Sequence, residues 1–292
     1  MTRTIVASAT REIVIGFDQP FCVIGERINP TGRKKLGALM AAGDFSLVRQ
    51  DALAQIAAGA SVLDVNAGYP LGNEALMLAE AVCVIERAAD IPLCLDSANP
   101  DALAAALAVY SGKALVNSVT AEEERLERIL PLARKYGAAV IGLAHDESGI
   151  SDDPRQRCVA ACRIFERAAD HGIPPGDLVI DPLCMSVATD ARAALITLET
   201  MRLIREELGV NMCLGASNIS FGLPDRRAVS AAFLPMAMAD GLTCAIADVT
   251  HPSIRQAVWA AELLLGQDQY ASRWIAHFRE SQQPAAELTP VG

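Results

Sequence analysis

Short apolar runs recur along the chain, and longer stretches separate them. The runs are continuous rather than alternating, as in 62–65 and 139–143, which is typical of strands buried on both faces of a parallel sheet. Eight such runs end at Gly25, Val65, Leu95, Asn117, Leu143, Asp181, Gly215 and Ala247. Their ends lie 22 to 40 residues apart, which leaves room each time for a right-handed crossover through a helix.

The stretches between the runs show the spacing of helices. Two sets of four apolar residues fall at i, i+3, i+4 and i+7, namely Leu126, Ile129, Leu130 and Ala133, and Ile254, Ala257, Val258 and Ala261. Each set predicts an amphipathic helix whose apolar face covers a sheet.

Eight strand-helix units in about 250 residues predict an α/β protein with a closed (β/α)8 TIM barrel, whose active site would lie at the carboxyl ends of the strands. An open doubly wound sheet is the alternative, but the sequence contains neither Gly-x-Gly-x-x-Gly after the first strand nor Gly-x-x-x-x-Gly-Lys-Ser/Thr, so the barrel is preferred. We expect residues 1–20 to form a short hairpin that closes the barrel bottom and 268–280 to form an extra helix. Residues 1–280 would then be a single domain, followed by a flexible tail at 281–292.

Composition and charge narrow the classes of partner. A hydrophobic content of 52% supports a sizeable core, and a net charge of −10 without a basic run argues against nucleic acid as a partner.

The eight cysteines form no Cys-x-x-Cys and no Cys/His cluster at zinc spacing, so we expect reduced core thiols and no protein-bound metal. Charged residues within the first 18 positions argue against a signal peptide, and no apolar run reaches membrane-spanning length. We therefore expect a cytoplasmic protein with no membrane partner.

Polar residues follow the apolar runs, and in a barrel they would share one rim. They are Glu26 and Asn29, Asp64 and Asn66, Asp96, Asn117, Asp181, Ser217 and Asn218, and Asp248. This rim lacks a zinc ligand set, a Ser-His-Asp arrangement and a lysine for a Schiff base. It suits a planar nitrogen heterocycle such as a pterin, because one carboxylate can accept from the 2-amino group and N3–H together.

Simpler interpretations exist for some of these residues. Asp64, Asp96 and Asp181 would alternatively cap helices or pair with cations. His145 and His251 also follow strands, and we interpret them as loop or cap residues rather than as proton shuttles.

Seven motifs at the strand ends resemble, in order and spacing, those of the pterin-binding methyltransferases that pass a methyl group between methyltetrahydrofolate and a corrinoid protein. They are Gly25-Glu26-Arg27-Ile28-Asn29, Asp64-Val65-Asn66-Ala67-Gly68, Leu93-Cys94-Leu95-Asp96-Ser97, Val116-Asn117-Ser118, Ile180-Asp181-Pro182, Gly215-Ala216-Ser217-Asn218-Ile219-Ser220 and Ala245-Ile246-Ala247-Asp248. The match runs from about Val23 to Leu265. The chain also resembles the folate-binding module of cobalamin-dependent methionine synthase.

The resemblance implies a pterin-binding TIM barrel and assigns roles within it. Asn218 would be the catalytic residue, because its side chain reaches N5 of the pterin. The residues that would bind the pterin are Glu26, Asp96, Asn117, Asp181, Gly215, Ser217 and Arg226. Asn29, Asp64, Asn66 and Asp248 are candidates for supporting positions behind them.

The resemblance further implies a methyltransferase that acts between N5 of tetrahydrofolate and the cobalt of a corrinoid, in either direction. Tetrahydrofolate or 5-methyltetrahydrofolate would be the folate substrate, a partner corrinoid protein would carry the cobalamin, and the enzyme would be a homodimer. Dihydropteroate synthase shares the barrel and the pterin pocket and is the alternative enzyme. That family places Arg and Lys after the serine of the seventh strand, where this chain has Asn218 and Ile219. A non-catalytic pterin-binding protein is a further alternative, against which Asn218 argues.

Overall fold

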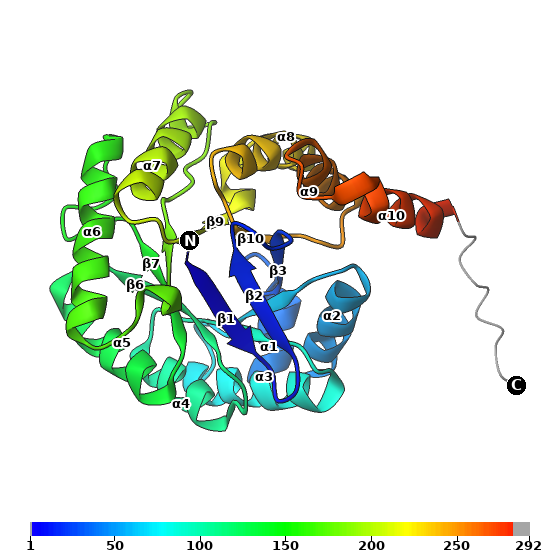
Figure 1. The fold of residues 1–292 in the computed structure, drawn as a ribbon. Helices are drawn as coiled ribbons and strands as arrows, with labels where there is room; N and C mark the ends of the chain where they lie inside the picture. The colour runs from blue at the N-terminus through cyan, green and yellow to red at the C-terminus, as the bar shows by residue number, and fades with distance from the viewer. Residues whose placement is uncertain (1, 283–292) are drawn as a thin grey trace, which may run out of the picture.

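In the computed structural model, which describes residues 2–282, eight parallel strands close into a barrel (Figure 1). The strands are β3 (Cys22–Ile28), β4 (Val62–Asn66), β5 (Leu93–Asp96), β6 (Leu115–Thr120), β7 (Ala139–Leu143), β8 (Leu178–Asp181), β9 (Asn211–Gly215) and β10 (Cys244–Ala247). They follow one another around the barrel in sequence order, and β10 pairs with β3 to close it. The predicted (β/α)8 barrel is confirmed.

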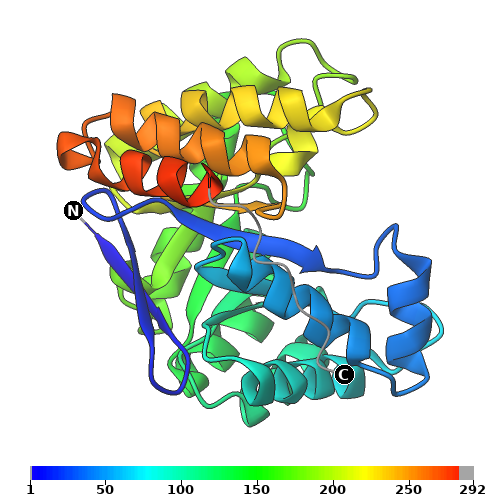
Figure 2. The same cartoon turned by 90° about the vertical axis from the view of Figure 1, so that its right-hand side faces the viewer.

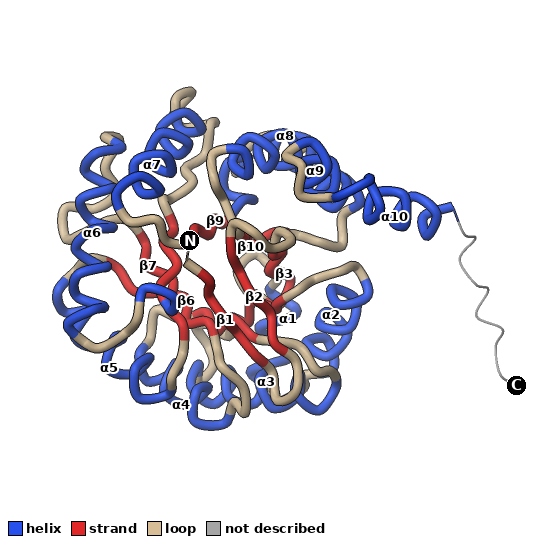
Figure 3. The backbone as a smooth tube through the Cα atoms, in the orientation of Figure 1, coloured by secondary structure: helices blue, strands red, loops and turns tan. Residues whose placement is uncertain are grey.

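Helices surround the strands as an outer layer, drawn blue around red in Figure 3. They are α1 (Lys34–Ala41), α2 (Ser46–Ala57), α3 (Glu74–Ala88), α4 (Pro100–Val109), α5 (Glu123–Tyr136), α6 (Pro154–Asp170), α7 (Ala193–Glu207), α8 (Arg226–Ala239), α9 (Pro252–Leu264) and α10 (Ser272–Gln282), with short 3-10 turns η1 (Pro175–Asp177), η2 (Ala216–Ser220) and η3 (Gln269–Ala271). The predicted apolar face of α5 is fully buried, and that of α9 is buried except at Ala257, which is partly exposed. Among residues 2–282, no helix has the length and apolar character needed to cross a membrane.

The predicted N-terminal hairpin is present, as the antiparallel pair β1 (Arg3–Ala7) and β2 (Glu12–Gly16). It lies across the amino-terminal end of the barrel (Figures 1 and 2). Val6 and Ile15 join the apolar cluster inside the barrel. Asn211, at the start of β9, donates hydrogen bonds to the Thr4 hydroxyl (2.9 Å) and the Ile15 carbonyl (3.0 Å). The hairpin therefore closes the barrel bottom.

The barrel interior next to this hairpin is filled by side chains, including Cys22, Cys94, Cys213 and Cys244. None of the eight cysteines forms a disulfide, and six of them are buried, as expected for reduced core thiols. The amino-terminal part of the barrel interior is therefore occupied by side chains.

The predicted extra helix corresponds to η3 and α10. Its start is fixed by the buried Asp268, whose carboxylate accepts from the backbone N–H groups of Arg273 (3.0 Å) and Trp274 (2.9 Å). Of the predicted tail, 281 and 282 belong to the end of α10, and 283–292 lie outside the described residues.

Candidate active site

A cavity of about 660 Å³ opens at the carboxyl ends of the barrel strands. The sequence-predicted residues that line it are Glu26, Asn29, Asp64, Asp96, Asn117, Asp181, Gly215, Ser217, Asn218 and Arg226. Of the predicted set, only Asn66 and Asp248 do not line it. The parallel strands thus bring side chains from distant parts of the chain to one place.

On one wall, two carboxamides each donate to a carboxylate. Nδ2 of Asn117 lies 3.1 Å from Oδ1 of Asp64, and Nδ2 of Asn66 lies 2.9 Å from Oδ2 of Asp96. Asn66, Asp96 and Asn117 are neighbours in register on β4, β5 and β6. The Asn66–Asp96 bond joins the adjacent strands β4 and β5, and the Asn117–Asp64 bond reaches from β6 past β5 to β4. Because Nδ2 of Asn117 and Oδ2 of Asp96 take part in these bonds, the Oδ1 atom of each residue remains available as an acceptor for a ligand.

Asp181 ends β8 and is buried. Its Oδ1 accepts from the backbone N–H of Leu183 at 2.8 Å. Among the described residues, Asp64, Asp96 and Asp181 cap no helix and enter no ion pair. The alternative that they are ordinary caps or salt-bridge partners therefore does not describe their geometry.

Burial changes the protonation behaviour of these carboxyl groups, because a low-dielectric site disfavours the charged form. It raises the pKa of Asp96 to about 6 and that of Asp181 to about 7. Burial, and then the nearby Asp96, raises the pKa of Asp64 well above its usual value. Burial also raises the pKa of Glu26. A ligand that brings hydrogen-bond donors would stabilise the ionised forms.

On the opposite wall, Ser217 connects η2 to β3. Its hydroxyl lies 2.9 Å from both carboxylate oxygens of Glu26. The Ser217 carbonyl in turn accepts from Nη2 of Arg226 at 2.8 Å, at the start of α8. The Arg226 guanidinium lies 5.3 Å from the centre of the Phe221 ring, within the range of a cation–π contact.

Asn218 lies in η2, directly after β9, and is exposed to the cavity. Its side chain takes part in none of the hydrogen bonds found among residues 2–282. A Cβ atom at Gly215 would lie 2.8 Å from Nδ2 of Asn218, closer than a Cβ atom approaches other heavy atoms outside its own residue and chain neighbours. The glycine therefore makes room for the carboxamide, which is free to meet a ligand.

Further residues line the cavity that were not among the predicted site residues: Arg27, Leu143 and Ile246 at strand ends, and Thr31, Gly32, Arg33, Ile150, Leu183, Cys184, Met185 and Phe221 in loops. Arg27 and Ile246 stood in two of the recognised motifs without being assigned to the site, and the apolar loop residues carry no signal that separates them from other surface positions. Arg27 lies 3.9 Å from Asp248, which places Asp248 beside the cavity residues rather than among them.

His145 and His251, the two histidines that follow strands, do not line the cavity. His251 caps α9, with Nδ1 2.7 Å from the Ser253 hydroxyl and 3.4 Å from the Ser253 N–H. His145 lies in the loop after β7. Both positions agree with the interpretation as cap and loop residues.

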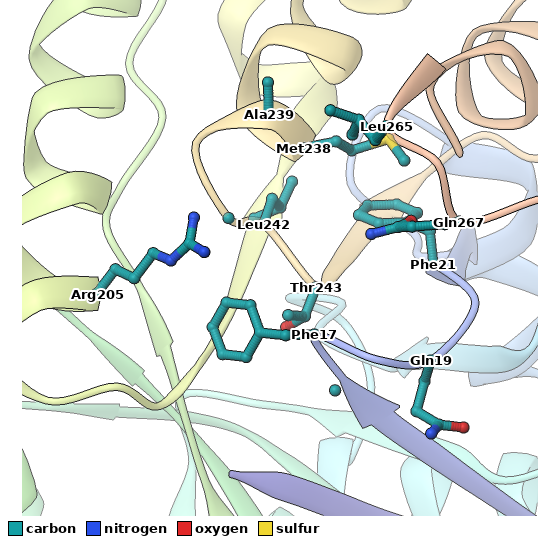
Figure 4. Close-up of a pocket in the computed structure, with 12 residues that line it drawn as sticks. Phe17, Gln19, Phe21, Arg205, Met238, Ala239, Leu242, Thr243, Leu265 and Gln267 are labelled. Carbon is teal, nitrogen blue, oxygen red and sulfur yellow. The ribbon is translucent and has the colours of Figure 1, made fainter. Parts of the chain in front are cut away.

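A second hollow, of about 220 Å³, lies at the opposite end of the barrel, where β2 ends and β10 begins. Figure 4 shows Phe17, Arg205 and Leu242 around it. Within the described part of the chain, no carboxylate lines it, so it lacks the acceptors found at the carboxyl ends of the strands.

Residues 25–248 match the family model described as "Pterin binding enzyme". A methylcorrinoid:tetrahydrofolate methyltransferase from Eubacterium limosum is 30% identical to this chain over 264 residues, which cover 88% of this chain and 96% of that protein.

Solved structures with a similar fold include dihydropteroate synthases. That of Thermus thermophilus has a TM-score of 0.66 and 22% identity, over 89% of this chain and 99% of that chain. That of Xanthomonas albilineans, in complex with 7,8-dihydropteroate, has a TM-score of 0.65 and 21% identity, over 89% and 98%. At these identities the likeness concerns the fold alone. From the family match and the similarity to the Eubacterium protein, this chain belongs to the pterin-binding enzymes and, among them, to the methyltetrahydrofolate:corrinoid protein methyltransferase family.

Proposed function

We propose that this protein transfers a methyl group from a methylated corrinoid to N5 of tetrahydrofolate. The observation that carries the proposal is one cavity that combines the acceptors Asp96, Asn117 and Asp181 with the uncommitted carboxamide of Asn218. The name of the Eubacterium relative supports this substrate pair and this direction.

The cavity suits a pterin in size and in chemistry. Its volume of about 660 Å³ lies in the range of small-molecule sites. A pterin presents the donors N3–H and 2-amino along one edge, and the carboxylates of Asp96 and Asp181 are acceptors for such an edge. Asn117 adds a neutral acceptor, because its amide group is already engaged by Asp64.

Asn218 supplies the group that would face N5. In tetrahydrofolate N5 carries a hydrogen, whereas in 5-methyltetrahydrofolate it does not, so the hydrogen-bond role of N5 changes during transfer. A carboxamide offers both a carbonyl acceptor and an N–H donor, and a rotation of the side chain presents either one. Such a contact contributes roughly 10²- to 10³-fold in rate. In-line positioning of the reacting atoms would supply the rest.

A methylcorrinoid would supply the methyl group and retain the bonding electron pair, while the N5 proton leaves to solvent. A partner protein would carry this cofactor to the mouth of the cavity. Phe221 and Met185 line the cavity with 65% and 37% of their surface exposed, which offers apolar contact area at the mouth. The homodimer implied by the resemblance stays a prediction.

A spectroscopic assay tests the proposal. The protein is mixed with methylcobalamin and tetrahydrofolate, and the cobalamin absorption spectrum is followed. We expect loss of methylcobalamin that requires both protein and tetrahydrofolate, with 5-methyltetrahydrofolate formed in equal amount. No methyl transfer, together with condensation of a pterin pyrophosphate with para-aminobenzoate, would instead identify a dihydropteroate synthase.

A further inference from the structure

Arg157, in α6, is a buried cation without an acidic hydrogen-bond partner among the described residues. Its side chain is 1% exposed. Nε donates to the Ser151 carbonyl at 2.6 Å, and Nη1 donates to the carbonyls of Pro182 (3.1 Å) and Leu183 (2.7 Å). A buried guanidinium is costly unless its donors are satisfied. Here backbone carbonyls from two loops, β7–α6 and β8–α7, satisfy them.

One of these carbonyls belongs to a residue in an unusual conformation. Leu183 has φ +68°, in the left-handed region that residues other than glycine seldom adopt and that surrounding contacts must support. Its carbonyl accepts from Arg157, and the Thr197 hydroxyl lies 3.0 Å from the same oxygen. Its N–H points the other way and donates to Oδ1 of Asp181. Leu183 thus connects the buried arginine to a carboxylate of the cavity.

We propose that Arg157 is a positioning residue for pterin binding: by holding the carbonyls of Pro182 and Leu183, it fixes the backbone N–H that orients Asp181. The inference rests on the proposed function, because it assumes that Asp181 accepts from the pterin. The inference predicts that substitution of Arg157 lowers the affinity for folate and changes the methyl-transfer rate at saturating folate only little.

The charge of Arg157 adds to this geometric role. The titratable group that acts on Asp181 is Arg157, from α6. Asp181 in turn acts on Cys184, in its own loop, and Asp152, in the β7–α6 loop, acts on Arg157. Burial raises the pKa of Asp181, and the Arg157 guanidinium opposes that rise. Loss of the positive charge should therefore weaken folate binding more at pH 6.5 than at pH 8.5, where Asp181 is ionised more fully.

Two substitutions separate geometry from charge. Arg157→Gln removes the charge and most donors, whereas Arg157→Lys keeps the charge but replaces the planar fork by one ammonium group. The matched control is Arg163→Gln, on the same helix, since Arg163 pairs with Glu147 at the surface (2.9 Å). Calorimetry between pH 6 and 9 gives the Kd for tetrahydrofolate, and thermal melts check the fold.

We expect Arg157→Gln to weaken binding at least tenfold at pH 7 and to move the pH midpoint of binding upward. Arg157→Lys should weaken binding by a similar factor but keep the midpoint closer to that of the wild type. Transfer rates at saturating folate should stay within about threefold in both, and Arg163→Gln should bind like the wild type. Wild-type affinity and midpoint in folded Arg157 variants would overturn the inference.

A double-mutant cycle tests the route through Leu183. Leu183→Gly lets the backbone adopt a positive φ without support. In that background, Arg157→Gln should cost at least threefold less affinity than in the wild-type background, because the two residues act through one conformation. Equal losses in the two backgrounds would contradict the route.

The remaining experimental outcomes also either support or overturn the inference. If both Arg157 variants fail to fold, Thr197→Val removes the second donor near the Leu183 carbonyl and keeps the side-chain shape. It should weaken tetrahydrofolate binding about threefold, and unchanged binding overturns the inference. If the wild-type protein itself binds no tetrahydrofolate, the proposed function fails, and the inference fails with it. If the wild type binds but the Arg157 variants bind equally well, the inference alone fails.

Discussion

Asn66 donates a hydrogen bond of 2.9 Å from Nδ2 to Oδ2 of Asp96, its register neighbour across β4 and β5. Its own carbonyl oxygen accepts from the Gly68 N–H at 2.8 Å, which fixes which end of the amide faces the carboxylate. One oxygen of Asp96 is therefore committed to the protein, and the other is available to a ligand. Asn66 thus supports the candidate site without lining the cavity.

Asn66→Ala should weaken tetrahydrofolate binding by about tenfold. A hydrogen bond to a charged group contributes roughly 1.5–3 kcal/mol, and part of that is regained when the ligand contacts the released oxygen. Asp96→Asn removes the acceptor charge itself and should cost at least as much. Calorimetry with tetrahydrofolate measures both, and cobalamin binding should stay unchanged in both. Wild-type folate affinity in Asn66→Ala would contradict the role given to this pair.

Folate binding should depend on pH and release protons. The pKa of Asp96 is about 6 and that of Asp181 about 7 in the ligand-free protein, and pterin N–H donors require the ionised carboxylates. Affinity should therefore fall as the pH drops through 7 and then through 6. Calorimetry at pH 6.5 in buffers of different ionisation enthalpy should detect proton release on binding. A binding heat that does not depend on the buffer would contradict this assignment.

Asp181→Asn should stabilise the ligand-free protein at alkaline pH. The folded-state pKa of about 7 lies above the usual value of 3.8, so the folded state binds more protons than the unfolded state between these values. The free energy of unfolding therefore falls as the pH rises through this window. The asparagine removes this dependence and should raise Tm by a few degrees at pH 8.

The surface variant Asp170→Asn is the control for that measurement. Asp170 forms an exposed ion pair with Arg167 (2.9 Å), and such pairs contribute little to stability. It should leave Tm near that of the wild type. A lower Tm for Asp181→Asn than for the wild type at pH 8 would show that the buried carboxylate is not a cost to folding.

Gly215→Ala should impair transfer while leaving the fold intact. The added Cβ would lie 2.8 Å from Nδ2 of Asn218, and the end of a flexible side chain moves away at small cost. The carboxamide would then leave its position in the cavity. We expect at least a tenfold slower methyl transfer with a Tm close to that of the wild type. An unchanged rate would mean that the present position of Asn218 does not matter for the chemistry.

The barrel was predictable from the sequence because buried parallel strands require continuous apolar runs, and each run here is a strand. The carboxylates and carboxamides were identifiable because they follow those runs. The first barrel strand extends past its predicted end at Gly25 to Ile28, and Glu26 nevertheless lines the cavity as predicted.

The arrangement within the site was not predictable in the same way. Nothing local in the sequence indicates that Asn117 binds Asp64, that Asp248 faces Arg27, or that Leu183 adopts a left-handed conformation. These features depend on side-chain rotamers and loop paths that tertiary packing selects. Arg157 illustrates the limit, because an arginine within an amphipathic helix predicts a solvent-exposed side chain, yet this one is buried against two loops.

The central claim is that Asn218 contacts N5 while a methyl group passes between a corrinoid and tetrahydrofolate. The most direct test is the single-turnover rate of tetrahydrofolate-dependent methylcobalamin loss in the wild type and in Asn218→Ala, at saturating folate. We predict that the variant binds tetrahydrofolate within about tenfold of the wild type but transfers the methyl group at least 100-fold more slowly, as expected for a contact made mainly in the transition state. A wild-type transfer rate in Asn218→Ala would contradict the claim.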